Sequence, residues 1–327
     1  MRKNAVLLVI LLGIVLPGIL FDQTWKRSTN VSTAEIHTVE YQPAISINVK
    51  NGEQVSCVQL EDYIIGVVLG EMPATFELEA LKAQAVATRT YTLHKILKQG
   101  KHDDADVCAD SSCCQAYINK NDYLLSKGTK ADVEKIETAV HDTEGQVLTY
   151  KGELIEATYF SCSGGMTEDA VAVWGTSVPY LESVISPGEN QAKYFETERI
   201  FTVDEFLTLL GVTAPTSLED SDVEFTYTDG NGVETMTLFG TSFTGIQVRK
   251  LLNLPSTAFS LTINGKQVVI KSRGYGHRVG MSQYGADAMA MNGSTYGEIL
   301  LHYYKGTSLV KLTDDQLKGL FDKEGNI

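Results

Sequence analysis

The sequence predicts an α+β protein of mixed helices and mainly antiparallel strands. It has a core domain with an inserted smaller lobe that forms a cleft, preceded by one N-terminal transmembrane helix. Residues 77–99 are a long run of strong helix formers. Short β-branched runs are joined by turns such as Asn51-Gly52 and Asn264-Gly265, which are typical of antiparallel hairpins. An apolar run near the N-terminus has the composition of a membrane segment.

The composition limits the class of protein. The chain has 327 residues, of which 43% are apolar, so it is long enough to bury a core and is not disordered. Its net charge is −14 and its pI is about 4.9. Because the phosphates of nucleic acids bind basic surfaces, we expect no nucleic-acid partner. The charge does not exclude a neutral glycan.

The N-terminal segment is expected to anchor the chain in a membrane. Residues 1–4 form a basic stub, residues 5–21 an apolar run, and residues 22–40 a polar tether rich in Ser and Thr. A helix of this length spans about 25 Å, slightly less than a bilayer core of about 30 Å. A cleaved signal peptide is the alternative, but the end of the run is a poor cleavage site. The basic flank places the N-terminus in the cytoplasm and the rest outside.

The remaining chain divides into three parts. We expect the core domain at residues 41–189 and 268–312, the inserted lobe at 190–267, and a loose acidic tail at 313–327. Helices are predicted at residues 77–99, 132–141, 203–210, 244–254, 281–291 and 295–304, and a helix start at residue 60. Strands are predicted at residues 45–49, 55–60, 146–150, 155–160, 260–263 and 268–272, the last returning the chain to the core.

Glu71 is a candidate proton donor. It follows an apolar run and precedes Met72-Pro73, where the chain must turn because proline cannot continue a helix. We expect this turn to hold the carboxyl close to a helix start and among apolar residues. Such surroundings raise the pKa of a carboxyl, and a carboxyl protonated near neutral pH can act as a general acid. The common alternative is a Glu that only interacts with the helix dipole.

A polar loop after the long helix concentrates metal ligands. His102, Cys108, Cys113 and Cys114 lie within thirteen residues, and these side chains are ones that zinc prefers. We expect a structural zinc ion, because four protein ligands leave no position for an activated water. The alternatives are free thiols or a disulfide from Cys108 to Cys113 or Cys114, which an external location permits.

A predicted strand runs into the small residues of Ser161-Cys162-Ser163-Gly164-Gly165. Glycines at a strand end allow a ligand to approach the backbone. Cys162 with His277 is a candidate nucleophile and base pair, although a buried inert cysteine is more common. Trp174 follows and could either stack on a sugar or pack in the core.

Two motifs resemble the stage II sporulation protein D family, which includes the amidase enhancer proteins. The first is GEMP followed by ELEALKAQAVATRTY, and the second is GHRVGMSQYGA beginning at Gly276. The resemblance covers about residues 45–310. It implies that Glu71 is the catalytic acid of a peptidoglycan lytic transglycosylase. It also implies that two stretches line the substrate groove: Tyr159, Ser161, Ser163 and Gly164, and His277, Ser282, Gln283 and Tyr284.

The resemblance further implies a reaction and its setting. Glu71 would protonate the glycosidic oxygen between N-acetylmuramic acid (MurNAc) and N-acetylglucosamine (GlcNAc), then accept the proton of the muramic C6 hydroxyl. The product would be a 1,6-anhydro end. The implied partners are glycan strands, a sporulation cell-wall amidase and other engulfment membrane proteins at the sporulation septum. No cofactor is required for this chemistry.

The chain departs from the family pattern at two positions. Cys113 stands where the family has a His, so the expected ligand set is one His and three Cys. Arg278 stands where the family has Gly after the His of the second motif, and we expect it to add a positive edge to the groove.

Three other functions remain open from the sequence. One is a hydrolase in which Glu168 or Asp169 is a second carboxylate, since glycosidases usually need two. Another is a non-catalytic glycan-binding module that stimulates a cell-wall amidase. The third is a Cys-His peptidase built on Cys162 and His277.

Overall fold

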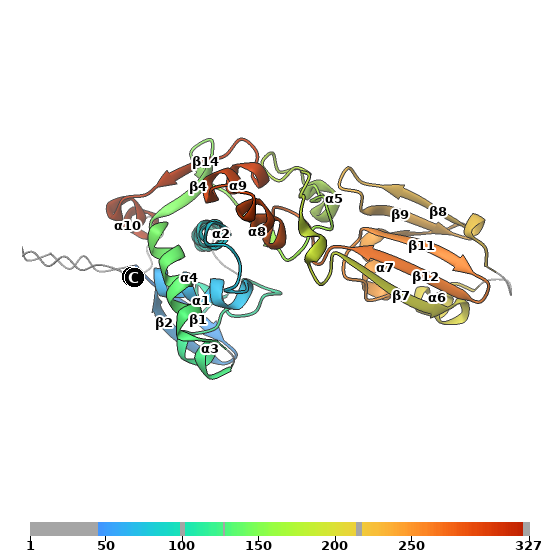
Figure 1. Cartoon of the computed structure of the whole chain (residues 1–327), viewed down its shortest axis with the longest axis horizontal. Coiled ribbons are helices and arrows are strands. Elements are labelled where there is room, and N and C mark those ends of the chain that lie inside the picture. The colour runs from blue at the N-terminus through green and yellow to red at the C-terminus, as the bar shows by residue number, and fades with distance from the viewer. Residues whose placement is uncertain (1–44, 99–101, 127, 214–217, 323–327) are drawn as a thin grey trace, which may run out of the picture. The chain divides into compact units, whose positions relative to one another are not determined.

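The computed structural model describes residues 45–98, 102–126, 128–213 and 218–322 (Figure 1). These residues form two hydrophobic clusters. One joins helices and strands from both ends of the described chain, and the other lies within residues 206–270. The prediction of an α+β fold with mainly antiparallel strands is confirmed. The second hydrophobic cluster lies mostly within the range predicted for the smaller lobe, residues 190–267, and extends to Ile270.

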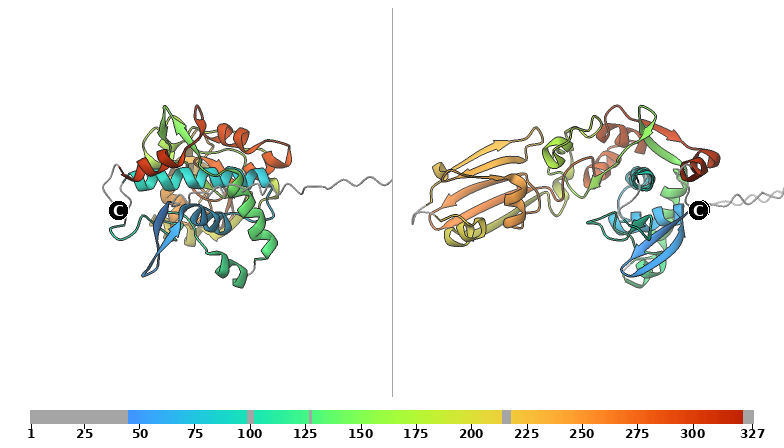
Figure 2. Two further views of the ribbon diagram at one scale, coloured as in Figure 1. Left: turned by 90° about the vertical axis from the view of Figure 1, so that its left-hand side faces the viewer. Right: turned by 180° about the vertical axis from the view of Figure 1, so that it is seen from behind.

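Helix α2 (Leu78–Leu97) is the centre of the core. It packs against α1 (Leu60–Glu71), α4 (Lys130–Asp142), α8 (Gln283–Met291), α9 (Tyr296–Tyr303) and strand β4 (Gln146–Tyr150), which surround it in Figures 1 and 2. Twelve of its 20 residues are buried, many of them alanines. Small side chains let neighbouring elements approach on every side, so this helix positions the segments around it.

Three small sheets complete the core. Strands β1 (Ser46–Asn51) and β2 (Gln54–Gln59) form the predicted hairpin, and β3 (Val107–Cys108) pairs parallel to β1. Strand β4 lies between β5 (Glu153–Leu154) and β14 (Ser308–Lys311). Strand β6 (Tyr159–Phe160) pairs parallel to β13 (Met281–Ser282). This last pair brings the predicted strand end near Tyr159 beside the motif that begins at Gly276.

The lobe contains two three-stranded antiparallel sheets. One has the order β11 (Phe259–Asn264), β12 (Gln267–Arg273), β7 (Glu196–Thr202), and the other β10 (Thr241–Thr244), β9 (Val233–Leu238), β8 (Val223–Tyr227). Helices α6 (Val203–Leu210) and α7 (Gly245–Leu251) complete it. The end of α6 was predicted correctly, because Gly211 adopts a left-handed conformation there (φ 69°).

Several local predictions differ from the structure. Strand β12 lies between β7 and β11 in the lobe and does not return to the core, because both of its edges pair there. The strand predicted at residues 155–160 is interrupted, since the chain leaves the β4 hairpin to pair with β13. Residues 281 and 282 belong to β13 and precede the helix predicted at 281–291. Helix α3 (Lys120–Ser126) was not predicted.

The tail is helical in part: α10 (Asp314–Asp322) buries Leu317 against the core. Three further helical segments are short. The 3₁₀ helices η1 (Glu189–Gln191) and η2 (Asp220–Asp222) each form one turn, and α5 (Ala170–Trp174) is a single α-helical turn. The predicted stub, anchor and tether at residues 1–40 lie outside the described residues. Within the part of the chain that the structure describes, no helix is long and apolar enough to cross a membrane.

Candidate active site

Glu71 is the last residue of α1, and Pro73 explains why the helix ends there. Met72 adopts an extended conformation (φ −123°, ψ 141°), which is typical of a residue before proline. The predicted turn is present, but Glu71 lies at a helix end, not close to a helix start. The negative end of a helix dipole disfavours an anion, so this position favours the protonated carboxyl.

The surroundings of Glu71 also favour protonation. Burial raises the pKa of its carboxyl above the ordinary value, which is the effect predicted from the sequence. Two interactions oppose part of this rise: the backbone amide of Ala116 donates to Oε1 at 2.7 Å, and the Gln283 side chain interacts with the carboxylate. Burial is the larger cause, so the proton is retained to higher pH than on an ordinary glutamate.

Glu71 lines a groove with a volume of about 560 Å³. Four of the predicted substrate-binding residues line it too: Tyr159, Ser161, His277 and Gln283. They come from β6 and the loop after it, from the loop between β12 and β13, and from the first residue of α8. The pairing of β6 with β13 thus brings residues more than a hundred positions apart to one site.

The other four predicted residues do not line this groove. Ser163 is fully buried and donates to Glu189, and Gly164 lines a second cavity. Ser282 is buried, and its hydroxyl accepts from the amide of Gly285 as the N-cap of α8. Tyr284 packs edge to face on Phe76, with ring centroids 5.0 Å apart. None of these four residues contributes to the lining of the groove that contains Glu71.

Gln283 has a donor available for a ligand. Its side chain is 5% exposed, and its amide Nε2 makes no hydrogen bond of normal geometry among the described residues. An unpaired buried donor costs free energy, which a ligand acceptor in the groove would recover. Gln283 is therefore suited to hold a polar group of a substrate beside Glu71.

A buried network positions Tyr159 across the groove. The Tyr159 hydroxyl donates to Gln115 Oε1 at 2.8 Å, and the Gln115 amide donates to Thr92 at 2.9 Å. Burial raises the pKa of the Tyr159 phenol, so it stays neutral. Gln115 was not predicted as a site residue. In the sequence it directly follows Cys114, one of the predicted metal ligands.

Aromatic side chains form one wall of the groove. Trp174 and Tyr275 line it and are 44% and 45% exposed. One face of the Tyr275 ring stacks on Tyr194, with ring centroids 4.4 Å apart. The ring of His277 lies 5.6 Å from those of Trp174 and Phe160. Exposed aromatic rings in a groove suit the apolar faces of sugars, and Trp174 therefore is not core packing. Tyr275 was missed, although its glycine neighbours were noted.

His277 is neutral near pH 7. Burial lowers the pKa of its imidazole to about 4, and the nearby Arg249 charge contributes. Its Nδ1 accepts a hydrogen bond from the amide of Val279 at 3.1 Å. The imidazole also makes a hydrogen bond with the backbone of Tyr159, so this neutral ring serves as a wall of the groove.

The structure does not favour a Cys162 nucleophile. Cys162 is fully buried, does not line the groove, and its Sγ donates to Glu189 at 3.1 Å. Burial also raises the pKa of the thiol, which keeps it protonated. Since the thiolate is the reactive form, this cysteine is structural.

Glu189 shapes the loop at residues 161–165. Its carboxylate accepts from the Ser163 amide at 2.7 Å, the Ser163 hydroxyl at 2.8 Å and the Gly164 amide at 3.1 Å, and also from Ser186. No sequence pattern identified this residue, because its contacts with Ser163 and Gly164 join segments 26 and 25 residues apart in the chain.

Arg278 does not form a positive edge of the groove, contrary to the prediction. It is 2% exposed, and its guanidinium donates to the carbonyls of Ser163, Met166 and Gly230 and pairs with Glu168. It adopts a left-handed conformation (φ 66°), which explains why a glycine is suited to this position. The arginine instead joins the core to the lobe.

The carboxylates expected for a hydrolase lie elsewhere. Glu168 is buried in its pair with Arg278, and Asp169 caps α5. Among the described residues that line the groove, only Glu71 and Glu156 carry carboxylates, and Glu156 pairs with Lys95 at 2.7 Å.

The four predicted metal ligands converge. The ligand atoms of His102, Cys108, Cys113 and Cys114 all lie within 4.8 Å of one another. His102 Nε2 is 3.6 Å from the Sγ atoms of Cys113 and Cys114, which are 4.0 Å apart. Tetrahedral zinc with ordinary bond lengths places such N–S and S–S pairs about 3.5–3.8 Å apart. Among the described residues no disulfide joins Cys108 to Cys113 or Cys114. The donor set therefore fits zinc.

We expect the carboxyl of Glu71 to titrate above the ordinary glutamate value when followed by carbon NMR. Gln283→Leu should raise its pKa further, because the Gln283 interaction lowers it. Thr138→Val, on the exposed face of α4, should leave the titration unchanged. A Glu71 pKa at or below the ordinary value would contradict the description of this site.

Comparison with known proteins agrees with the two motifs. A family model described as "Stage II sporulation protein" matches residues 49–150. Stage II sporulation protein D of Bacillus subtilis is 37% identical over 287 residues, covering 86% of this chain and 83% of that protein. Its counterpart in Bacillus amyloliquefaciens is 37% identical over 264 residues, covering 79% and 76%.

A protein named amidase enhancer from Bacillus subtilis is also similar. It is 30% identical over 300 residues, covering 75% of this chain and 40% of the longer enhancer. The site geometry, both motifs and these relatives lead to one conclusion: the chain belongs to the stage II sporulation protein D family.

Proposed function

We propose that the protein is a peptidoglycan lytic transglycosylase that cleaves the β-1,4 bond between MurNAc and GlcNAc. The observation that carries this proposal is Glu71, a carboxyl with a raised pKa in a groove lined by exposed aromatic rings. The second carboxylate of the groove, Glu156, is neutralised by Lys95. A reaction that needs one carboxyl fits this arrangement better than one that needs two.

A single residue would act first as acid and then as base. Protonated Glu71 gives its proton to the O4 atom of GlcNAc as the bond from O4 to muramic C1 breaks. The O6 atom of the same muramic residue then bonds to C1, and its proton returns to Glu71. The products are a GlcNAc end with a free O4 hydroxyl and a 1,6-anhydro-muramic end, with no water consumed. The raised pKa keeps the acid loaded for the first step.

The other groove residues would hold the strand. The Nε2 group of Gln283 has two N–H donors, so beside its interaction with Glu71 it is suited to an acetamido or hydroxyl oxygen close to the scissile bond. Tyr275 and Trp174 would stack on sugar rings, and Tyr159, held by Gln115, would limit rotation of the bound ring. Positioning of this kind contributes to the rate by reducing the entropy lost on reaching the transition state.

We also propose that His102, Cys108, Cys113 and Cys114 hold a structural zinc ion. When bound, the ion would fix the loop whose Ala116 amide contacts Glu71, two residues after Cys114. Its four positions would be filled by protein ligands, so it supplies no activated water.

The zinc proposal predicts about one ion per chain by elemental analysis. Cys114→Ala should lose the ion and lower the unfolding midpoint by about 5–10 °C, since 1 kcal/mol corresponds to about 2–4 °C in a domain of this size. Cys57→Ala removes an exposed thiol in β2 and is the matched control, expected to retain the ion and the midpoint. A wild-type protein that holds no zinc after refolding with the metal would contradict the proposal.

The setting is part of the same proposal. Residues 5–21 would be a single-pass anchor with the N-terminus in the cytoplasm and the catalytic domain outside the membrane, at the sporulation septum. Its substrate would be the peptidoglycan of engulfment, with a cell-wall amidase and other engulfment membrane proteins as partners. The similarity to a protein named amidase enhancer supports the link to an amidase.

Mass spectrometry of the products tests the reaction. The protein is incubated with peptide-free glycan strands, and anhydro-muramic ends are the expected result. Reducing ends would mean a hydrolase and would overturn the transglycosylase. Bound but intact strands would favour the second candidate, a non-catalytic glycan-binding module that stimulates an amidase, which the name of the similar enhancer protein suggests.

A further inference from the structure

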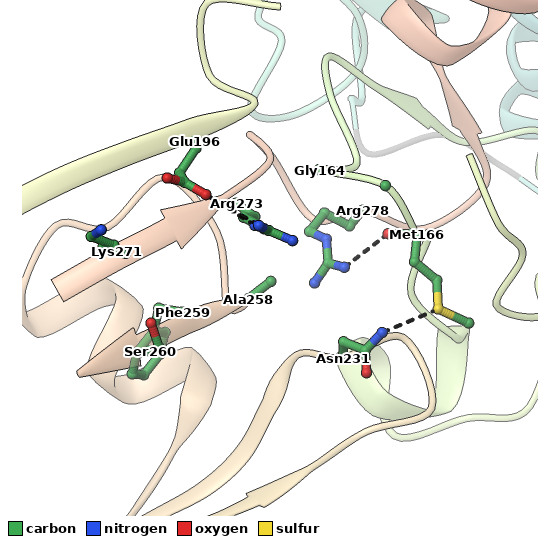
Figure 3. Close-up of a pocket in the computed structure, with 11 residues that line it drawn as sticks. Gly164, Met166, Glu196, Asn231, Ala258, Phe259, Ser260, Lys271, Arg273 and Arg278 are labelled. Carbon is green, nitrogen blue, oxygen red and sulfur yellow. Dashed lines mark hydrogen bonds and ion pairs between the residues drawn. The ribbon is translucent and has the colours of Figure 1, made fainter. Parts of the chain in front are cut away.

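A second cavity, with a volume of about 650 Å³, lies where the lobe meets the core. Figure 3 shows it between the loop at residues 164–166 and strands β11 and β12. It shares no lining residue with the groove of Glu71. The two sites nevertheless use neighbouring parts of the same segments: Ser161 and Tyr275 line the groove, while Gly164 and Arg273 line the cavity.

The cavity is basic in an acidic protein. Three cationic side chains line it, Lys271, Arg273 and Arg278, against one carboxylate, Glu196. The chain as a whole carries a net charge of −14. Glu196 neutralises part of the positive charge of the cavity through its 3.2 Å ion pair with Arg273. Lys271 has a longer contact, 4.0 Å, with Glu198. The side chains of Lys271 and Arg273 are 56% and 60% exposed, so donors of both remain accessible to an anion in the cavity.

Arg278 supplies an independent observation. It is 2% exposed, yet its Nη1 makes no hydrogen bond among the described residues and has only a 3.5 Å ion pair with Glu168. Its Nε and Nη2 atoms are fully used by backbone carbonyls. In Figure 3 the guanidinium groups of Arg273 and Arg278 both face the space between Gly164 and Ala258. An unsatisfied buried donor beside a second guanidinium is typical of a site for an anion.

The alternative is an ordinary charged sheet face. Cross-strand pairs such as Glu196 with Arg273 are common on exposed strands and contribute little to stability. They account for the charges on β7 and β12. They do not account for the Nη1 atom of Arg278, which makes no hydrogen bond among the described residues and lies outside both strands.

We propose that this cavity binds a carboxylate carried by the glycan strand whose cleavage is proposed above, and the inference rests on that function. Each muramic residue bears a lactyl group, which ends in a free carboxylate where no peptide is attached and carries peptide carboxylates where one is. Two residues of extended chain span about 7 Å, so a strand stacked on Tyr275 passes close to Arg273. A guanidinium fork is suited to a planar carboxylate.

Binding to the Glu71→Gln protein, measured by calorimetry, tests the inference without turnover. The ligands are peptide-free strands, the same strands with the lactyl carboxylates converted to methyl amides, peptide-bearing strands, and neutral chitin oligomers of equal length. Lys271→Ala combined with Arg273→Ala removes two exposed charges from the cavity. Lys250→Ala combined with Lys266→Ala removes two exposed charges elsewhere in the lobe and is the matched control.

At low salt, we expect the cavity variant to bind peptide-free strands about tenfold more weakly than the parent Glu71→Gln protein does. Its affinity for chitin oligomers should be unchanged. A loss confined to peptide-free strands assigns the lactyl carboxylate, and a loss confined to peptide-bearing strands assigns a peptide carboxylate. Either supports the site. Equal affinity of parent, cavity variant and control for every strand, or an equal loss with chitin and amidated strands, would overturn it.

Failure of the inference is distinguishable from failure of the function. If the wild-type protein forms anhydro ends while the cavity variant binds all strands as the parent does, only the anion site is wrong. If the Glu71→Gln protein binds no strand at all, both are wrong.

Discussion

Glu71→Gln is expected to lower the rate of anhydro-end formation by about 10²- to 10⁴-fold, the range typical of losing a general acid or base. Glutamine has nearly the same shape and can still accept the Ala116 amide through its side-chain oxygen, but it can neither give nor take the proton. Strand binding and the unfolding midpoint should therefore remain close to wild type. The rate is measured by mass spectrometry, as the amount of anhydro-ended product formed over time.

Glu156→Gln is the matched control, because it removes the other carboxyl of the same groove. We expect a reduction of less than about tenfold, since Glu156 is already paired with Lys95 and does not exchange the proton. Equal losses in the two variants, together with reducing ends from the wild type, would identify a two-carboxylate hydrolase.

Glu71→Gln should also change how the free energy of unfolding depends on pH. The folded-state pKa of Glu71 is raised, so between its unfolded and folded pKa values the folded protein binds more protons than the unfolded chain. The contribution of Glu71 to stability is thus full below the ordinary value and is lost as pH rises through the raised value. Glu71→Gln should remove this loss, which urea unfolding at several pH values can measure.

Arg89→Met is expected to destabilise the protein by about 3–5 kcal/mol, the cost typical of breaking a buried ion pair from one side. Arg89 is fully buried in α2, and its Nε donates to Glu61 at 2.7 Å. Its Nη1 also donates to the Gln146 carbonyl at 3.1 Å, so the substitution leaves a carboxylate and a carbonyl without their donor. Urea unfolding measures the change in free energy.

Arg273→Met is the matched control for this prediction. It removes the same type of side chain from an Arg–Glu pair, but the side chains of Arg273 and Glu196 are 60% and 47% exposed. Water replaces the lost contact there, so we expect a loss of less than about 1 kcal/mol. If the two substitutions lower the free energy of unfolding equally, the buried pair of Arg89 and Glu61 stabilises the protein no more than an exposed pair does.

Local chemistry determined much of the fold. The alanine-rich composition of residues 77–99 predicted α2, and Gly211 predicted the end of α6. Asn51-Gly52 and Asn264-Gly265 predicted two hairpins, because turn residues act within a few positions of the chain. The motifs around Glu71 and His277 identified the family, and Pro73 predicted the break after Glu71. These features depend on neighbouring residues, so the sequence alone contains them.

Only the tertiary structure decided what those residues contact. The donor to Glu71 comes from Ala116, and the acceptor for Ser163 comes from Glu189. Arg278, expected at the groove edge, is buried because Ser163, Met166 and Gly230 offer it carbonyls from distant segments. Strand β12 joined the lobe because both of its edges found partners there. Such contacts depend on long-range packing and on hydrogen-bond partners far along the chain, which local patterns of hydrophobicity and turn residues do not specify.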